Sequence, residues 1–401
     1  MPDFVYLDNA ATTFPKPPEV IQFMCDFYQT RGVNPGRTGF DLALEAEETL
    51  ADARRALTDF FGGGDPNRLV FSYNVTDALN LLISSVLEPG DHAITTCLEH
   101  NSVLRPMYRH RELGVEVDFV PFDHRGYIDP DDIARRIRSN TKLVVVNHGS
   151  NVIGTIQPVE AIGRICRDHG VLFAIDAAQT AGLVPIDVVA MNIDVVCFTG
   201  HKSLFGPSGT GGLYICEHVD IRPCRAGGTG VMSALKNQPD AYPWRMEFGT
   251  VNTMGVAGLL AAQRWIVDRG GVQSIYEHEM RHARRLREGL EKIEGVQLYC
   301  ADLERQHLPV FVFNVDGLPA DQTGTFLDVE HDVITRTGLH CAPLVHEGIG
   351  TFEADGTVRF SPGVFTTDEE VERAIDAVVA TAEIGRERIG SVSEKVLSTS
   401  S

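Results

Sequence analysis

The sequence lacks the features that mark membrane-spanning, secreted and cluster-binding proteins. No apolar run approaches the roughly 20 residues that span a bilayer, and the first eight residues hold no basic region followed by an apolar one. The eight cysteines are scattered without a C-x-x-C pair, which argues against zinc ribbons, metal clusters and thioredoxin-type centres. We therefore predict a cytoplasmic protein with no metal site, in which disulfides are not expected.

Basic side chains are also scarce. The 35 Lys and Arg residues stand against 55 Asp and Glu, so the net charge is −20, which disfavours nucleic acid or an anionic membrane as the main partner. An anionic ligand would therefore need a locally built site. The length of 401 residues, 43% of them hydrophobic, is enough for a large core and two domains.

Short apolar runs typical of strands alternate with helix-like segments between residues 69 and 216. This alternation predicts an α/β fold with a mostly parallel sheet and helices on both of its faces. The segment 74–87 is the clearest helix, because cap residues precede apolar residues that share one face. The expected strands are 69–72, 92–96, 117–122, 143–147, 171–175, 194–198 and 212–215.

Beyond about residue 255 a second unit begins. A long charged helix-like stretch, 257–294, leads into further strands and helices, among them strands 308–315 and 358–361 and an amphipathic helix at 367–384. We predict a large domain at 15–260 and a smaller α+β domain made of 1–14 and 261–390. The serine-rich tail 391–401 is expected to be frayed.

Two side chains capable of chemistry follow expected strands. Asp176 comes directly after the run 171–175, and Lys202 comes shortly after 194–198. Ligands of open α/β sheets bind beyond the carboxyl ends of the strands. A lone lysine is most often a solvated surface charge, but an amine beside a carboxylate at this edge suits covalent chemistry.

A phosphate site is predicted nearby. The junction 72–77 contains Thr76 and would present free N–H groups at a helix N-terminus, although such a cluster is usually only a helix cap. Thr199 and His201 flank Lys202 and could bind the same anion. The glycine-rich run 206–212 lacks the G-K-[S/T] ending of a P-loop and precedes a strand, so we interpret it as a structural turn.

These parts fit pyridoxal phosphate (PLP). Lys202 would form the Schiff base, and Asp176 would keep the pyridine nitrogen protonated so that the ring acts as an electron sink. His100, just after the expected strand 92–96, could stack on the ring and exchange protons. The alternative is that His100 is an ordinary surface-loop histidine.

The chain resembles the class V aminotransferase-fold PLP enzymes and, among them, the cysteine desulfurases. The resemblance runs almost end to end, and it implies the type I fold of PLP-dependent transferases with a large and a small domain. The matching blocks are YLDNAATT (6–13), EH (99–100), SNVIGT (150–155), DAAQ (176–179), GHK (200–202), EFGT (247–250), RTGLHCA (336–342) and RFS (359–361).

The resemblance implies a role for each matching residue of the cofactor site. Lys202 would bond to the cofactor, Asp176 would pair with its pyridine nitrogen, Gln179 would bind its phenolic oxygen and His100 would stack on the ring. Thr250 would reach in from the second subunit of a homodimer to the phosphate. The other expected phosphate ligands are Val75, Thr76, Thr199 and His201.

Cys341 is the residue that selects the reaction. Its segment, GLHCAP (338–343), predicts a small flexible loop in which the thiol lies beside an imidazole and is accessible and reactive. The resemblance implies that Cys341 takes sulfur from L-cysteine as a persulfide and leaves L-alanine. Asn151, also placed near the cofactor, and Arg359 would fix the substrate carboxylate, with Arg336 nearby.

Several alternatives remain open. A selenocysteine lyase acting on L-selenocysteine would use the same parts, whereas a class V aminotransferase or epimerase would not need Cys341. A non-catalytic scaffold of this fold would lack Lys202 or Arg359, and both are present. A metal hydrolase is disfavoured because the 14 histidines show no metal-ligand spacing.

Two segments depart from the pattern of the family. Leu339 stands where related compact-loop desulfurases tend to carry another histidine, and 226–230 does not reproduce their Gly-Gly loop on the dimer side. Eighteen positions separate Cys341 from Arg359. This spacing favours a compact nucleophile loop and a dedicated sulfur-acceptor protein.

Overall fold

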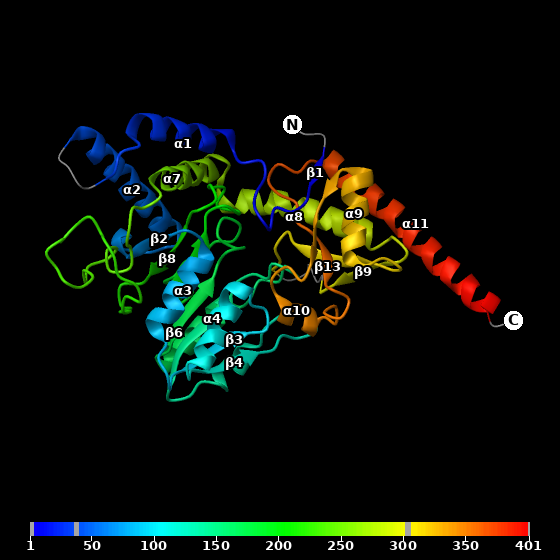
Figure 1. The fold of residues 1–401 in the computed structure, drawn as a ribbon, viewed down its shortest axis with the longest axis horizontal. Coiled ribbons are helices and arrows are strands. Elements are labelled where there is room, and N and C mark those ends of the chain that lie inside the picture. The colour runs from blue at the N-terminus through cyan, green and yellow to red at the C-terminus, as the bar shows by residue number, and fades with distance from the viewer. Residues whose placement is uncertain (1–3, 36–39, 301–305, 400–401) are drawn as a thin grey trace.

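The computed structural model describes residues 4–35, 40–300 and 306–399, and its centre is a seven-stranded sheet (Figure 1). The strands are β2 (Leu69–Ser72), β3 (His92–Thr96), β4 (Glu116–Val120), β5 (Thr141–Asn147), β6 (Leu172–Asp176), β7 (Val195–Thr199) and β8 (Gly211–Ile215). Their order is β2-β8-β7-β6-β5-β3-β4. All neighbours are parallel except β8, which is antiparallel to both β2 and β7. The predicted α/β fold with a mostly parallel sheet is confirmed.

Helices surround this sheet and connect its strands. In Figure 1, α3 and α4 lie together in front of the strands, while α1, α2 and α7 pack against one another at one end. The helices are α1 (Pro18–Arg31), α2 (Asp41–Phe60), the 3-10 turn η1 (Pro66–Arg68), α3 (Val75–Val86), α4 (Asn101–Glu112), α5 (Pro130–Ala134), α6 (Val159–His169), α7 (Thr253–Asp268), α8 (Gly271–Leu290), α9 (Ala320–His331), α10 (Pro343–Gly348) and α11 (Asp368–Thr399).

The start of α3 illustrates how the sequence fixes an element that carries the site. The Asn74 side chain accepts a hydrogen bond from the Asp77 N–H at 3.0 Å, which satisfies one of the free donors of the first turn. Leu79, Leu82 and Ile83 are fully buried on its inner side. The capped N-terminus is thereby held at the edge of the sheet, as the sequence predicts.

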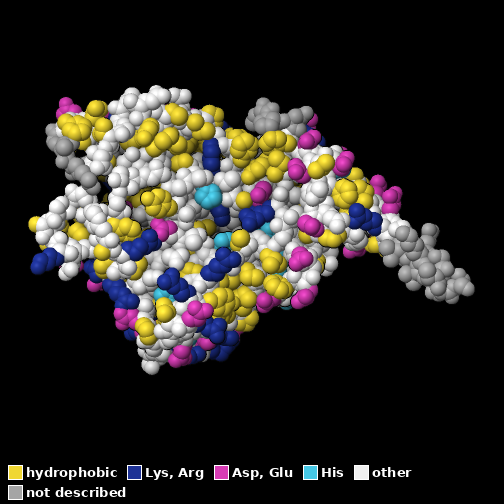
Figure 2. Space-filling view, in the orientation of Figure 1, with side chains coloured by type: hydrophobic (Ala, Val, Ile, Leu, Met, Phe, Trp, Pro, Cys, Tyr) yellow, Lys and Arg dark blue, Asp and Glu magenta, His cyan; other side chains and the backbone are white. Residues whose placement is uncertain are grey.

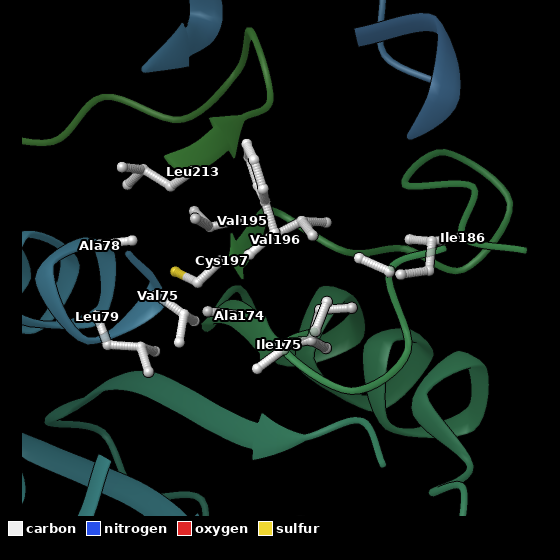
Figure 3. Close-up of a cluster of buried hydrophobic side chains, with 14 of the residues drawn as sticks. Val75, Ala78, Leu79, Ala174, Ile175, Ile186, Val195, Val196, Cys197 and Leu213 are labelled. Atoms are coloured by element: carbon white, nitrogen blue, oxygen red, sulfur yellow. The ribbon is translucent and has the colours of Figure 1, made fainter. Parts of the chain in front are cut away.

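The large core lies between this helix and the central strands. In Figure 3, Val75 and Leu79 of α3 lie beside Ala174 of β6 and Cys197 of β7. Because both faces of β6 and β7 are covered, these strands are almost continuously apolar. Each fully buried Val, Leu or Ile contributes about 1.5–3 kcal/mol, and burial raises the pKa of the Cys197 thiol well above its ordinary value.

A second, antiparallel sheet has the order β12-β13-β10-β9. Its strands are β9 (Val296–Tyr299), β10 (Phe311–Val315), β12 (Arg336–Gly338) and β13 (Thr357–Phe360). A separate parallel pair joins β1 (Val5–Tyr6) to β11 (Val333–Ile334). Val5, Phe313 and Phe360 belong to one core here, so the N-terminal segment packs with the C-terminal part of the chain (Figure 1). The predicted domain limits, 1–14, 15–260 and 261–390, stay a prediction.

Two helical segments differ from the expectation. The predicted stretch 257–294 forms two helices. Gly270 and Gly271 have φ values of 88° and 82°, which an α-helix does not allow, so the helical conformation is interrupted between α7 and α8. The helix expected at 367–384 continues as α11 to Thr399, through most of the segment that we expected to be frayed. The helix continues through Gly385. A glycine is needed there for close packing, because a Cβ at this position would lie 2.2 Å from the Asp316 carbonyl oxygen. No described helix is apolar enough over its length to cross a membrane.

Candidate active site

The predicted amine and carboxylate lie at the same edge of the large sheet. Asp176 ends β6, in register with Cys197 of β7, and Lys202 lies in the turn that follows β7. Burial lowers the pKa of Lys202 to about 8, although the charge of Asp176 opposes that shift. A substantial fraction of this amine is therefore neutral, and nucleophilic, near pH 8.

Asp176 can accept a further hydrogen bond from a bound ring. Its side chain is 3% exposed, and Oδ1 accepts the Ala178 N–H at 2.9 Å. Burial raises the pKa of Asp176, whereas that hydrogen bond and the charge of Lys202 lower it. A protonated pyridine nitrogen would add a further favourable partner for the ionised carboxylate.

His100 is fixed by its own helix. It is the N-cap of α4, and its Nδ1 accepts the Ser102 N–H at 3.0 Å. Burial, together with repulsion from Lys202 and from nearby arginines, lowers the pKa of His100 to about 3. The imidazole is therefore neutral at physiological pH, and Nε2 is the nitrogen left for a cofactor or substrate.

Ser102, which the sequence reasoning missed, links this histidine to the expected phosphate site. The Ser102 Oγ lies 2.8 Å from His100 Nδ1 and 2.6 Å from the Oγ1 of Thr76. Thr76 belongs to the first turn of α3, directly after Val75. The N-termini of α3 and α4 therefore converge, and the only signal in the sequence was a serine two positions after the histidine.

The residues around Lys202 leave a buried donor or acceptor available. The Nδ1 of His201 is buried without a hydrogen-bond partner among the described residues, while its carbonyl accepts Thr12 Oγ1 at 3.0 Å and also Lys16 Nζ. Thr199 ends β7 beside it. Such an orphaned imidazole nitrogen fits a phosphate ligand. Gln179 uses one amide hydrogen on the Ala10 carbonyl at 3.0 Å and keeps the other.

Arg359 lies at the centre of the expected carboxylate site. It is 1% exposed, donates from Nη2 to Asp8 Oδ1 at 2.5 Å and from Nη1 to the Asn151 carbonyl at 3.0 Å. Its Nε is buried without a partner among the described residues. Asp8 was missed by the sequence reasoning, because 351 positions separate it from Arg359. Strand β13, the N-terminal segment and the segment after β5 thus meet at one guanidinium.

Cys341 is close to an arginine rather than to the imidazole that the sequence suggested. The Arg336 Nη2 lies 3.5 Å from Cys341 Sγ. The expectation of an adjacent imidazole is wrong: His340 turns away, with Nε2 3.1 Å from the Thr357 carbonyl. The backbone at both residues is left-handed, with φ values of 47° at His340 and 59° at Cys341. Each such left-handed residue costs about 1–2 kcal/mol.

Most of the predicted site residues lie beneath the surface, since the side chains of Asn151, Asp176, Gln179, Thr199 and Arg359 are buried. Figure 2 shows histidine and Lys or Arg side chains near the middle of the visible face, between the regions of α7 and α10 in Figure 1. Thr250 differs, because it is exposed on the long loop between β8 and α7 and lines a hollow with Ser72, Tyr73 and Asp77. Within the described residues no group of three or more His, Cys, Asp or Glu side chains could hold a metal ion.

The chain is similar to known proteins over nearly its whole length. Residues 5–374 match the family model Aminotransferase class-V. A probable cysteine desulfurase of Methanothermobacter thermautotrophicus is 33% identical over 375 residues, which cover 92% of each chain. A cysteine desulfurase of Shigella flexneri is 30% identical over 381 residues, which cover 92% of this chain and 91% of the relative.

Solved structures give the same likeness. The apo structure of cysteine desulfurase from Thermococcus onnurineus superposes with a TM-score of 0.87, at 34% identity and over 95% of both chains. The cysteine desulfurase CsdA from Escherichia coli superposes with a TM-score of 0.84, at 26% identity and over 95% of both chains.

Proposed function

The chain belongs to the class-V aminotransferases and, among them, to the cysteine desulfurases, and from that premise we propose that it uses PLP to convert L-cysteine to L-alanine while Cys341 takes the sulfur. The observation that carries this proposal is that the Lys202 amine and the buried Asp176 carboxylate lie at one sheet edge, and that the loop of Cys341, whose thiol lies beside Arg336, is hydrogen-bonded to the start of α4 at Asn101. The positive charges of Arg336 and Arg359 both lower the pKa of Lys202, so the expected carboxylate-binding residues lie close enough to the amine to affect it.

The residues at this edge fit PLP. When bound, PLP supplies an electron sink for negative charge at the substrate Cα. Lys202 would hold it through the amine, and Asp176 would pair with the ring nitrogen. The orphaned His201 nitrogen supports a phosphate at the α3 N-terminus. The remaining contacts would come from Val75, Thr76, His100, Asn151, Gln179 and Thr199.

Arg359 would bind the substrate carboxylate through the guanidinium N–H groups that Asp8 and Asn151 leave free. Fixing the carboxylate decides which bond of the substrate Cα lies perpendicular to the cofactor ring. Lys202 Nζ, neutral in part near pH 8, then accepts the proton from Cα. His100 is neutral at physiological pH, because its pKa is lowered to about 3, and it would stack on the cofactor ring.

The Cys341 thiolate then attacks the substrate sulfur. A sulfur–sulfur bond forms, the carbon–sulfur bond breaks, and the electron pair of that bond stays on the carbon fragment, which is reprotonated and released as alanine. Arg336, 3.5 Å from Sγ, is placed to orient the thiol and to balance negative charge there. The product on the protein is a persulfide.

The test is turnover of L-cysteine with alanine and released sulfide both measured, and L-selenocysteine in parallel. We expect Cys341→Ser to lose at least about 100-fold in sulfide release, while the visible cofactor band and its response to added cysteine persist. Cys25→Ser, at an exposed thiol, is the matched control. Full sulfide release by Cys341→Ser would exclude the persulfide route. A strong preference for selenocysteine would instead make the protein a selenocysteine lyase.

We further propose a homodimer in which Thr250 of one subunit completes the phosphate site of the other, and a thiol-bearing acceptor protein for the persulfide. The exposure of Thr250 on a long loop supports the first proposal.

We also propose that the protein works in a reducing compartment such as the cytoplasm, because all eight cysteines are free thiols.

A further inference from the structure

We propose that the N-terminus of α4 holds the nucleophile loop in place, and that the backbone N–H of Asn101 is the positioning group. Asn101 is the first residue of α4, where the N–H has no partner within the helix. That N–H donates to the carbonyl oxygen of Cys341 at 2.7 Å. A carbonyl at this helix end also benefits from the positive end of the helix dipole.

A second hydrogen bond holds the preceding carbonyl. The Asn151 side chain donates from Nδ2 to the carbonyl oxygen of His340 at 2.7 Å. Two successive carbonyls of the loop, those of His340 and Cys341, are therefore each fixed by a residue of the large domain. The loop otherwise belongs to the small domain, because it follows β12 and leads into α10.

The loop needs hydrogen bonds from outside its own segment because its backbone is strained. Gly338, His340 and Cys341 all have positive φ values of 98°, 47° and 59°, and two of the three carry side chains. A single local bond, from the Ala342 N–H to the Leu339 carbonyl at 2.9 Å, closes the turn. The side chain of Cys341 is half-buried, and among the described residues its polar partner is Arg336, with Nη2 3.5 Å from Sγ. The two bonds from the large domain thus set where Sγ points.

The same helix end also positions His100. The imidazole of His100 caps α4 by accepting the Ser102 N–H. Ser102 directly follows Asn101, whose N–H holds the Cys341 carbonyl. A shift of the α4 N-terminus therefore moves the residue expected above the cofactor ring and the nucleophile together. The expected effect on turnover rests on the proposed role of Cys341 as the nucleophile. The docking of the loop against α4 can be tested without substrate.

The test compares Asn101→Pro with Asn101→Ala. Proline is favoured at the first helical position, and its ring replaces the N–H by Cδ, so the hydrogen bond to the Cys341 carbonyl cannot form. His100 before it has φ −69° and ψ 156°, which a following proline allows. Alanine removes the side chain and keeps the N–H. We expect turnover of cysteine to be about fivefold or more lower in Asn101→Pro than in Asn101→Ala, the effect of one lost hydrogen bond. The cofactor band and the thermal midpoint should match between the two.

The second readout is the rate at which iodoacetamide alkylates Cys341 without substrate, followed on the Cys341 peptide by mass spectrometry. Release of the loop should raise this rate about threefold or more in Asn101→Pro relative to Asn101→Ala. Equal turnover and equal alkylation in the two variants would overturn the proposal.

Alkylation of Cys341 in Asn151→Ala is an independent test, which still applies if the proline variant folds poorly. A role for Asn151 in substrate binding alone predicts no change in alkylation without substrate, whereas the docking role predicts a faster rate, and an unchanged rate counts against docking. The Cys341→Ser result separates the two proposals: full activity there would overturn the persulfide route and leave the alkylation result standing.

Discussion

Burial favours the neutral form of both nitrogen bases at the site, but by different amounts. It lowers the pKa of Lys202 to about 8 and that of His100 to about 3. At neutral pH His100 has therefore lost its proton, while most of Lys202 is still charged. Between these two residues, only Lys202 changes its protonation in the range where proteins usually work.

The first prediction concerns the capture of PLP by cofactor-free protein. Only the neutral amine reacts, so the rate should rise with pH up to about 8 and then level off, because the pKa of Lys202 is lowered from 10.5. Stopped-flow absorbance between pH 6 and 10 measures it. Lys202→Ala should form no bond that borohydride can trap. A rate that kept rising to pH 10 would mean that the amine is not desolvated.

The second prediction concerns Glu99, a fully buried carboxyl group that accepts Thr96 Oγ1 at 2.7 Å and the Asn147 N–H at 2.9 Å. Burial raises the pKa of Glu99 to about 8. Between about pH 4.5 and 8 the folded state keeps a proton that the unfolded state has lost, so this group makes the protein less stable as pH rises.

Glu99→Gln removes that dependence. The free energy of unfolding of Glu99→Gln minus that of the wild type should therefore increase from pH 5 to pH 8, by about 1–3 kcal/mol. Urea unfolding at the two pH values measures it, and every other titrating group cancels in the difference. A difference independent of pH would show that Glu99 is ionised in the folded protein.

Single residues show where sequence reasoning succeeds and where it stops. Lys202 and Asp176 could be predicted because each follows a recognisable apolar strand. Asp8 could not, since its partner Arg359 is 351 positions away and nothing local marks the contact. His340 was placed wrongly because its imidazole contacts Thr357 of β13, a partner that nothing near Cys341 in the sequence marks.

At the scale of elements, the turn that carries Lys202 packs tightly against the segment after β6. Gly182 has φ 98°, and a Cβ there would lie 1.9 Å from the Ser203 carbonyl oxygen. The clash is with backbone, which cannot turn aside as a side chain can. The position of Lys202 therefore depends on a glycine outside its own turn.

The third prediction follows from that contact. Gly182→Ala should lower the stability by about 3 kcal/mol or more and alter the visible cofactor band, because the turn at Lys202 must move. Gly170→Ala is the matched control: its φ is also positive, 66°, but nothing lies within 4 Å of its Cβ position at the end of α6. It should cost only about 1 kcal/mol and leave the spectrum unchanged. Similar effects of both variants on the spectrum would contradict the argument.

The elements themselves were predictable where both local pattern and burial agree. The large-sheet strands lie within one or two residues of their expected limits, because each is an apolar run between turn residues. The break between α7 and α8 was missed, since the charged pattern continues across Gly270 and Gly271 and only their φ values separate the helices.

At the scale of the whole molecule, the proposed homodimer gives the fourth prediction. If Thr250 acts on the partner's site, a dimer of one Lys202→Ala and one Thr250→Ala subunit has one intact site. Random reassortment of equal amounts should then yield about a quarter of the wild-type sites, since half of the dimers are mixed. Activity after subunit exchange, with light scattering to confirm a dimer, measures this.

Reassortment of wild type with the double variant Lys202→Ala plus Thr250→Ala is the matched control. If Thr250 serves its own subunit, the mixed single-variant dimers hold no intact site and activity stays at the level of the unmixed proteins. That result would withdraw Thr250 from the proposed site while leaving the roles of Lys202 and Asp176 untouched.

The ion pair between Asp8 and Arg359 also bears on when the site can form during synthesis. A ribosome adds about 5–20 residues per second, so the 351 positions between the partners correspond to tens of seconds. Until β11 and β13 emerge, the N-terminal segment has neither its strand partner nor its guanidinium. The large sheet can fold in that interval, whereas the site that needs both ends cannot. Nascent chains should therefore acquire the ability to bind substrate only near the end of translation.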